Sequence, residues 1–129
     1  MKEPRWLSDT VVLTVHADQI REHGGSLGLR DRDLLDSALS RPRNRFAYES
    51  ESDLCDLAAS YGFGIARNHP FVDGNKRVAF QAMYVFLGLN ASRIDAPEEE
   101  VVGLMLALAS GELDELDLAS WLRDHTSPR

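Results

Sequence analysis

Two apolar helical stretches, separated by a short polar break that contains a proline, occupy residues 54–88 of the sequence. Before the break, Leu57, Tyr61 and Ile65 recur every four residues, and after it Val78 and Ala82 continue the same spacing. Apolar residues at this spacing form one face of a helix, and that face must be buried against other parts of the chain. The sequence therefore predicts two packed helices that, together with the next apolar helix along the chain, form the centre of a helical bundle.

Helix caps, glycines and prolines divide the rest of the sequence into further helical segments. Ser8 is a good N-cap for a first helix, and the Gly24-Gly25 pair is a typical helix stop. Pro42 is expected to stop the second helix, and residues 43–52, which have no helical period, are expected to form a short strand or an extended flap. The predicted helices lie near 8–24, 31–42, 52 or 53 to 68, 75–88, 97–111, and after 114. The predicted fold class is all-α: a single compact domain of about six helices over residues 1–129.

The composition excludes several classes of protein. The 14 basic and 21 acidic residues give a net charge of −7, so we expect neither direct DNA binding nor binding to an anionic membrane surface. Cys55 is the only cysteine, which rules out a disulfide within the chain and favours a reducing compartment. The first residues form no apolar signal segment, and no apolar run approaches the roughly 20 residues that span a bilayer. We therefore expect a cytoplasmic protein that makes no contact with a membrane.

The break between the two central helices concentrates chemically active side chains, and residues 69–77 read His-Pro-Phe-Val-Asp-Gly-Asn-Lys-Arg. A helix that begins near Asn75 leaves the N–H groups of its first turn unpaired, which is a ready anion site. Gly74 has no Cβ and lets the backbone approach a phosphate closely. Lys76 adds a point charge, and Arg77 adds a planar fork that matches phosphate oxygens. These four residues are therefore candidates for phosphate binding.

Two further residues of the break supply the remaining chemistry. Asp73 offers a hard oxygen ligand of the kind that holds Mg²⁺ beside phosphates. His69 carries an imidazole, the side chain best suited to take a proton from a hydroxyl at neutral pH. A base, a metal ligand, a phosphate cradle and cations are the parts needed to move a phosphorus group from a nucleotide to a hydroxyl.

A purely structural interpretation of the same residues stays open at this point. Asp73-Gly74 is a common turn signal, and His69 could serve only as a cap or a packing group. Against this interpretation, Lys76 and Arg77 lie in a first helical turn, where the helix dipole disfavours positive charge. A bound anion would resolve that conflict.

Other candidate features have simpler interpretations. The segment Gly62–Gly64 resembles half of a dinucleotide-binding motif, but it lies in a helical pattern without a preceding strand, so it is expected to allow close helix packing. His16 lies on the apolar face of the first predicted helix and is expected to be buried with its polar atoms satisfied. A transition-metal site formed by His16, His69 and Asp73 is disfavoured, because there is no Cys partner and no His-pair spacing.

The nine residues from His69 to Arg77 resemble the signature of the Fic/Doc superfamily, H-x-F-x-[DE]-[AG]-N-[GK]-R. Lysine at position 76 is the form seen in the Doc (death-on-curing) toxins, whereas most Fic adenylyltransferases carry glycine there. The resemblance extends over nearly the whole chain, with supporting similarity at Gly24-Gly25, 45–49 and 109–112.

The resemblance implies a Fic fold, a small helical bundle in which the motif loop opens the central helix. It implies that His69 is the general base, that Asp73 is the Mg²⁺ ligand, and that Phe71 packs under the loop. It also implies that Asn75, Lys76 and Arg77 hold phosphates. Doc toxins transfer the γ-phosphate of ATP to a threonine of elongation factor Tu, which halts translation, and their partner is a Phd-type antitoxin that blocks them through a disordered C-terminal segment.

One departure from the wider pattern favours the kinase branch. Adenylyltransferases of the superfamily usually carry a second arginine three residues after the first, and this chain has Phe80 there. Arg67 is a candidate to replace the missing cation, so a nucleotidyltransferase stays open as an alternative. A small helical regulator that binds a partner without chemistry is a third interpretation. The chain has no [ST]-x-x-x-E-[GN] inhibitory stretch, so control is expected to come from a separate protein.

Overall fold

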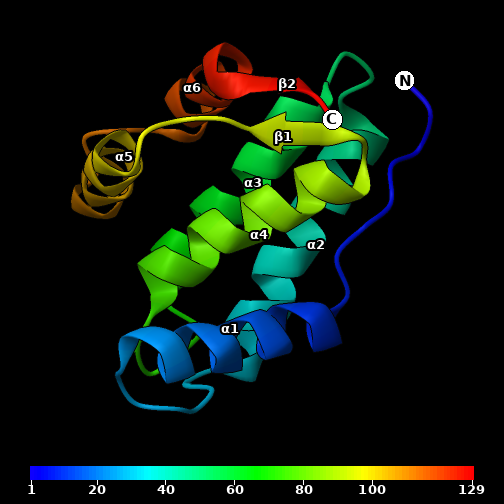
Figure 1. Ribbon diagram of the computed structural model, residues 1–129. Coiled ribbons are helices and arrows are strands. Elements are labelled where there is room, and N and C mark those ends of the chain that lie inside the picture. The colour runs from blue at the N-terminus through cyan, green and yellow to red at the C-terminus, as the bar shows by residue number, and fades with distance from the viewer.

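Six helices make up most of the computed structural model, which describes residues 1–129 (Figure 1). The all-α class expected from the sequence is confirmed, with the addition of one small two-stranded sheet. None of the helices has the length and apolar character that crossing a membrane requires. The elements in chain order are α1 (Asp9–His23), α2 (Arg32–Tyr48), α3 (Leu54–Asn68), α4 (Asn75–Leu89), β1 (Ser92–Ile94), α5 (Glu98–Ser110), α6 (Glu115–His125) and β2 (Thr126–Pro128).

Helices α3 and α4 form the centre of the bundle, as their apolar faces predict. Ten of the 15 residues of α3 are buried, and α3 packs against α2, α4 and α6 (Figure 1). Helix α5 was also expected at the centre, and that expectation is wrong. It lies at the edge of the bundle, where Leu104, Met105 and Leu108 face the core but Val102 and Leu106 remain exposed.

The predicted starts of α1, α2, α3 and α6 agree closely with the structure because each of these helices has a capping side chain. Ser8 accepts the N–H of Val11 at the start of α1. Asp53, and not Ser52, caps α3 in a reciprocal capping box with Asp56. Asp114 forms the same arrangement at the start of α6. Local hydrogen bonding of this kind can be recognised from the sequence alone.

Helix α2 does not stop at Pro42, and the strand or flap expected over 43–52 is wrong, because the helix continues through the buried proline. A proline inside a helix removes one backbone hydrogen bond and crowds the carbonyl four residues earlier, which costs about 3 kcal/mol. Arg45, about one turn later, fastens the continuation: it donates to the Glu115 carboxylate at 2.7 Å and to the Asp56 carbonyl at 3.2 Å. Contacts with α6 and α3 therefore outweigh the local helix-stop signal.

The small sheet joins the segment that follows α4 to the C-terminus of the chain. Strand β1 follows α4, and it pairs antiparallel with β2 at the C-terminus, with Arg93 opposite Ser127. Both strands have only three residues. The sheet therefore closes the bundle at the end opposite the α3–α4 loop (Figure 1).

The glycines of α3 allow close helix packing, as expected. A Cβ at Gly64 would lie 3.2 Å from both the Cα and the Cβ of Ala38 on α2, and Gly62 faces the Met83 side chain on α4. The absence of a side chain at these positions lets the α2 backbone lie directly against Gly64 and the Met83 side chain lie directly against Gly62.

We expect Gly64→Val to lower the free energy of unfolding by about 1–3 kcal/mol, because its extra methyl groups would meet the backbone of α2, which cannot move away. Gly103→Val in α5 is the matched control, since a Cβ there meets nothing within 4 Å. Urea denaturation of both variants checks this, and equal midpoints for the two would contradict the packing argument.

Candidate active site

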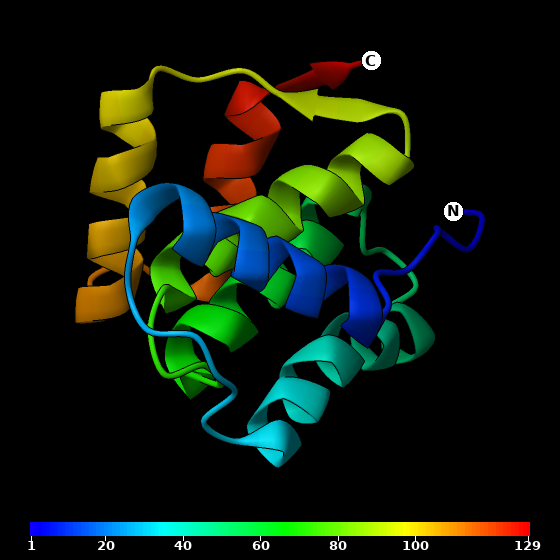
Figure 2. The ribbon, with the colours of Figure 1, turned by 60° about the horizontal axis from the view of Figure 1, so that its bottom comes forward.

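The loop between α3 and α4 lies at the end of the bundle where α1 also ends (Figure 2). The connection from α1 to α2 runs beside this loop. Leu29 and Phe71 form an antiparallel bridge, the Val72 N–H donates to the Gly28 carbonyl at 3.0 Å, and the Arg30 N–H donates to the Pro70 carbonyl at 2.7 Å. Two segments that are 40 or more residues apart therefore build the site together.

Two residues in the left-handed conformation set the direction of the loop. His69 ends α3 with a φ of 49°, and Gly74 precedes α4 with a φ of 78°. A non-glycine residue in this conformation needs support from its surroundings. Arg30 provides it, because its guanidinium donates to the carbonyls of His69 at 2.7 Å and Asn68 at 2.8 Å. The imidazole of His69 remains exposed and makes no hydrogen bond within the protein.

The side chain of Asn75 fixes the base of the loop. Its Oδ1 accepts the N–H of Phe71 and its Nδ2 donates to the carbonyl of the same residue, both at 3.0 Å. Both residues are buried, so Phe71 packs under the loop as the family resemblance implied. Asn75 was expected to hold phosphates; its side-chain amide makes two hydrogen bonds to Phe71, and its backbone N–H has no protein partner.

The first turn of α4 has the unpaired amides that the predicted anion site requires. The N–H groups of residues 75, 76 and 77 donate to no protein acceptor, and the turn contains no acidic residue. The exposed Lys76 forms no ion pair. The guanidinium of Arg77 donates to the carbonyls of Gln19 at 3.4 Å and Gly24 at 3.2 Å, so it links the start of α4 to the end of α1.

Asp73 is exposed and held in a fixed orientation by two backbone amides. Its Oδ2 accepts the Ser26 N–H at 3.2 Å, and its Oδ1 accepts the Gly74 N–H at 2.8 Å. These two hydrogen bonds, with the charge of Arg77, lower the pKa of the Asp73 carboxyl below its ordinary value. The group is therefore ionised at neutral pH, as a metal ligand must be.

The surroundings of Asp73 fit a metal ion that arrives with phosphates. No group of three or more His, Cys, Asp and Glu side chains gathers anywhere in the structure, so a cation at Asp73 would share its coordination with phosphate oxygens and water. Gly25 keeps this position open: with a φ of 117°, a Cβ there would lie 2.6 Å from the Asp73 Oδ2. The sequence indicated only a helix stop and a family similarity at Gly25, and it pointed to no part for Ser26 or Arg30 in this site.

His16 is buried with its ring nitrogen satisfied, as expected from its place on the apolar face of α1. Its partner was not foreseen: Nε2 lies 2.9 Å from the carbonyl oxygen of Asp73, and its ring stacks on Phe71 at 4.0 Å. No sequence signal connects His16 to the motif, because 57 residues separate it from Asp73.

A groove of about 610 Å³ extends from the first turn of α4 along α4 and α5. Lys76 and Arg77 line one end, Phe80 lies along it, and Val102 and Leu106 are exposed in its wall. Arg67, considered as a replacement for the cation missing at position 80, lies 5.1 Å from the ring centroid of Phe63 and does not line the groove.

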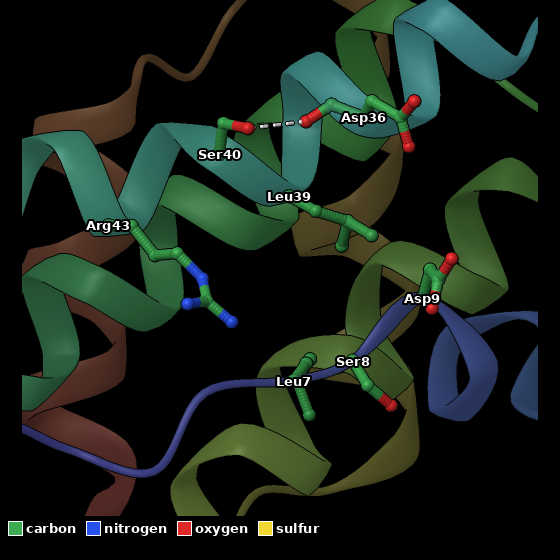
Figure 3. A pocket seen from close by; sticks show the side chains of 7 residues that line it. All are labelled: Leu7, Ser8, Asp9, Asp36, Leu39, Ser40 and Arg43. Atoms are coloured by element: carbon green, nitrogen blue, oxygen red, sulfur yellow. Dashed lines mark hydrogen bonds between the residues drawn. The ribbon is translucent and has the colours of Figure 1, made fainter.

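A second hollow, of about 370 Å³, lies at the other end of α1 between the N-terminal segment and α2 (Figure 3). The 15 residues of α1 place it roughly 22 Å from the motif loop. The two carboxylates of this hollow are already engaged, because Asp9 and Asp36 both pair with Arg32. The Ser40 hydroxyl donates to the Asp36 carbonyl at 2.9 Å. The hollow has no histidine to match the base of the loop.

Comparison with known proteins identifies relatives over most of the chain. The model of the family described as Fic/DOC matches residues 6–87. The protein named "Protein kinase doc" from Escherichia phage P1 is 32% identical over 120 residues, which cover 92% of this chain and 94% of that protein. The protein named "Toxin Doc" from Mycolicibacterium smegmatis is 36% identical over 102 residues, which cover 77% of this chain and 78% of that protein.

We expect Asn75→Asp to lower the free energy of unfolding by about 1–3 kcal/mol, because a carboxylate would face the Phe71 carbonyl in place of a donor. The exchange rate of the Phe71 amide should rise as the loop loosens. Lys76→Gln is the control, since its exposed side chain has no partner and its replacement should change stability by less than about 0.5 kcal/mol. Amide exchange and urea denaturation check both, and an unchanged Phe71 amide would contradict the role of Asn75.

Proposed function

Because the chain belongs to the Fic/DOC family, we propose that it is a Doc-type toxin that transfers the γ-phosphate of ATP to a protein hydroxyl, with a threonine of elongation factor Tu as the target. The observation that carries this proposal is the first turn of α4, where three free amides and the Lys76 ammonium lie at the end of the loop that holds His69 and Asp73. Family membership and the names of the relatives support it.

The residues of the loop have the chemistry for a direct transfer. The exposed imidazole of His69 accepts the proton of the target hydroxyl as its oxygen attacks the γ-phosphorus. The bond between this phosphorus and the bridging oxygen to the β-phosphate breaks, and ADP leaves with that oxygen. The α4 amides, Lys76 and Arg77 stabilise the negative charge of the phosphates. The products are a phosphorylated hydroxyl and ADP.

Asp73 is the residue that would hold Mg²⁺. When bound, this ion would neutralise phosphate charge and orient the leaving group. The protein's own contribution is the orientation of the carboxylate, which the amides of Ser26 and Gly74 fix before any ligand arrives. Preorganisation of this kind lowers the cost of ordering the site during the reaction.

Phe80 favours phosphate transfer over nucleotide transfer. An aromatic side chain lines the groove where adenylyltransferases of the superfamily carry a second arginine, and Arg67 does not replace that cation. The relative from phage P1 is named a protein kinase, which supports the same choice. Nucleotidyl transfer is the second candidate, supported by the phosphate-binding loop that both branches share.

A Phd-type antitoxin is the proposed partner, and the groove along α4 and α5 is its proposed binding place. Tyr84, Val102 and Leu106 are large apolar residues that line the groove and are 44%, 52% and 54% exposed. Exposed apolar side chains gathered along a groove suit the apolar face of an added helix. Because Lys76 and Arg77 lie at its end, a segment bound there would reach the phosphate site and block it.

We expect purified chain, mixed with elongation factor Tu and ATP labelled separately at the α- and γ-phosphates, to transfer label from the γ-position only. His69→Ala should lower the rate by about 10²–10⁴-fold while ATP binding persists, because only the base is lost. His125→Ala on α6, outside the loop and the groove, is the control. Label from the α-position would establish nucleotidyl transfer instead, and a His69→Ala variant that still arrests growth would indicate a module without catalysis.

Substitution in the groove tests the partner. We expect Leu106→Glu to weaken binding of a Phd-type antitoxin C-terminal segment by at least about tenfold, since a charge would replace an apolar contact. Leu116→Glu on α6 is matched in chemistry and lies outside the groove, so it should leave the affinity unchanged. Isothermal titration calorimetry measures both, and equal affinities would place the antitoxin elsewhere.

A further inference from the structure

We propose that His16 is a positioning residue that keeps the first turn of α4 open for phosphate, an inference that rests on the proposed function. His16 is 4% exposed and belongs to α1, far from the motif in sequence. Its side chain nevertheless touches the loop at several points. It stacks on Phe71 at an interplanar angle of 9°, and its Cδ2 would lie 3.8 Å from a Cβ at Gly74.

The hydrogen bond to Asp73 has a defined direction. The Nε2 of His16 lies 2.9 Å from the Asp73 carbonyl oxygen, and a carbonyl can only accept, so Nε2 carries the proton and donates it. The bond pairs a backbone carbonyl that no backbone N–H in the protein satisfies. His16 therefore takes the place of the backbone N–H that would pair with this carbonyl in a helix.

The helical partner would be the N–H of Arg77. In an α-helix the carbonyl of residue 73 accepts the amide of residue 77, and that bond would extend α4 by one residue toward its N-terminus. Here the bond is absent, Gly74 is in the left-handed conformation, and the Arg77 amide stays free. By holding the Asp73 carbonyl, His16 prevents this extension and preserves the third free amide of the anion site.

The same bond also affects the metal ligand. The Asp73 carboxylate and carbonyl belong to one residue, so a peptide that turned into α4 would also move the carboxylate away from the Ser26 amide. His16 thus orients the phosphate cradle and the carboxylate together, although it touches neither the target nor the phosphates.

Two variants separate this role from packing. His16→Gln keeps an N–H donor at nearly the same position but loses the aromatic stack, whereas His16→Phe keeps the stack and loses the donor. If His16 serves only to pack, ATP binding will follow the stability of the variants. If it positions the loop, ATP binding will follow the presence of a donor.

The measurements are ATP binding with Mg²⁺ by calorimetry, urea denaturation, and solvent exchange of the Arg77 amide by NMR without nucleotide. For His16→Phe we expect ATP binding weaker by about fivefold to tenfold, as for the loss of one hydrogen bond. Its Arg77 amide should exchange at least about tenfold more slowly, because it gains the Asp73 carbonyl. The KM for ATP should rise by a similar factor, and His16→Gln should restore wild-type values.

The outcomes distinguish the two proposals. If wild-type protein binds no ATP, the proposed function fails, and the exchange of the Arg77 amide alone decides the role of His16. An Arg77 amide that exchanges equally fast in wild type and His16→Phe overturns the positioning role. ATP binding that weakens in His16→Gln as much as in His16→Phe also overturns it.

Discussion

The paired hydrogen bonds between the Asn75 side chain and the backbone of Phe71 are the contact on which the candidate active site depends. They satisfy the backbone N–H and carbonyl of the buried Phe71, which no helix or strand pairs. With its base fixed in this way, the loop can project the His69 imidazole and the Asp73 carboxylate outward from a rigid support. The side chains of His69 and Asp73 are exposed, but Phe71 and Asn75, which support them, are buried.

The core and the site share the same helices, which explains how a short loop can be ordered. Helix α3 ends at the loop and α4 begins there, and both are the most buried helices of the bundle. A displacement of α3 would disturb its close packing against α2 and α6, and a displacement of α4 would disturb its packing against α3 and α1. The unpaired amides of α4 are therefore arranged during folding, before any ligand binds.

The loop could be predicted from the sequence because its functional residues are contiguous and its helix boundaries have local signals. The continuation of α2 could not, since the ion pair that holds Arg45 joins it to Glu115, 70 residues away. The position of α5 at the edge of the bundle could not be predicted either, because the apolar residues of an edge helix have the same spacing as those of a central helix. The roles of His16 and Arg30 likewise depend on contacts across the chain, which no spacing reveals.

The connection after α1 makes the motif incomplete as a description of the site. The Ser26 amide can donate to Asp73, and Gly25 can leave room beside it, only because the chain from His16 to Ser26 has its present length. A residue inserted between His16 and Ser26 would move the Ser26 amide away from Asp73, although all nine motif residues would be unchanged. A homologue with such an insertion would match the motif in a sequence search and still lack a formed site. Whether a homologue keeps the activity therefore has to be judged from the motif and from the connection after α1 together.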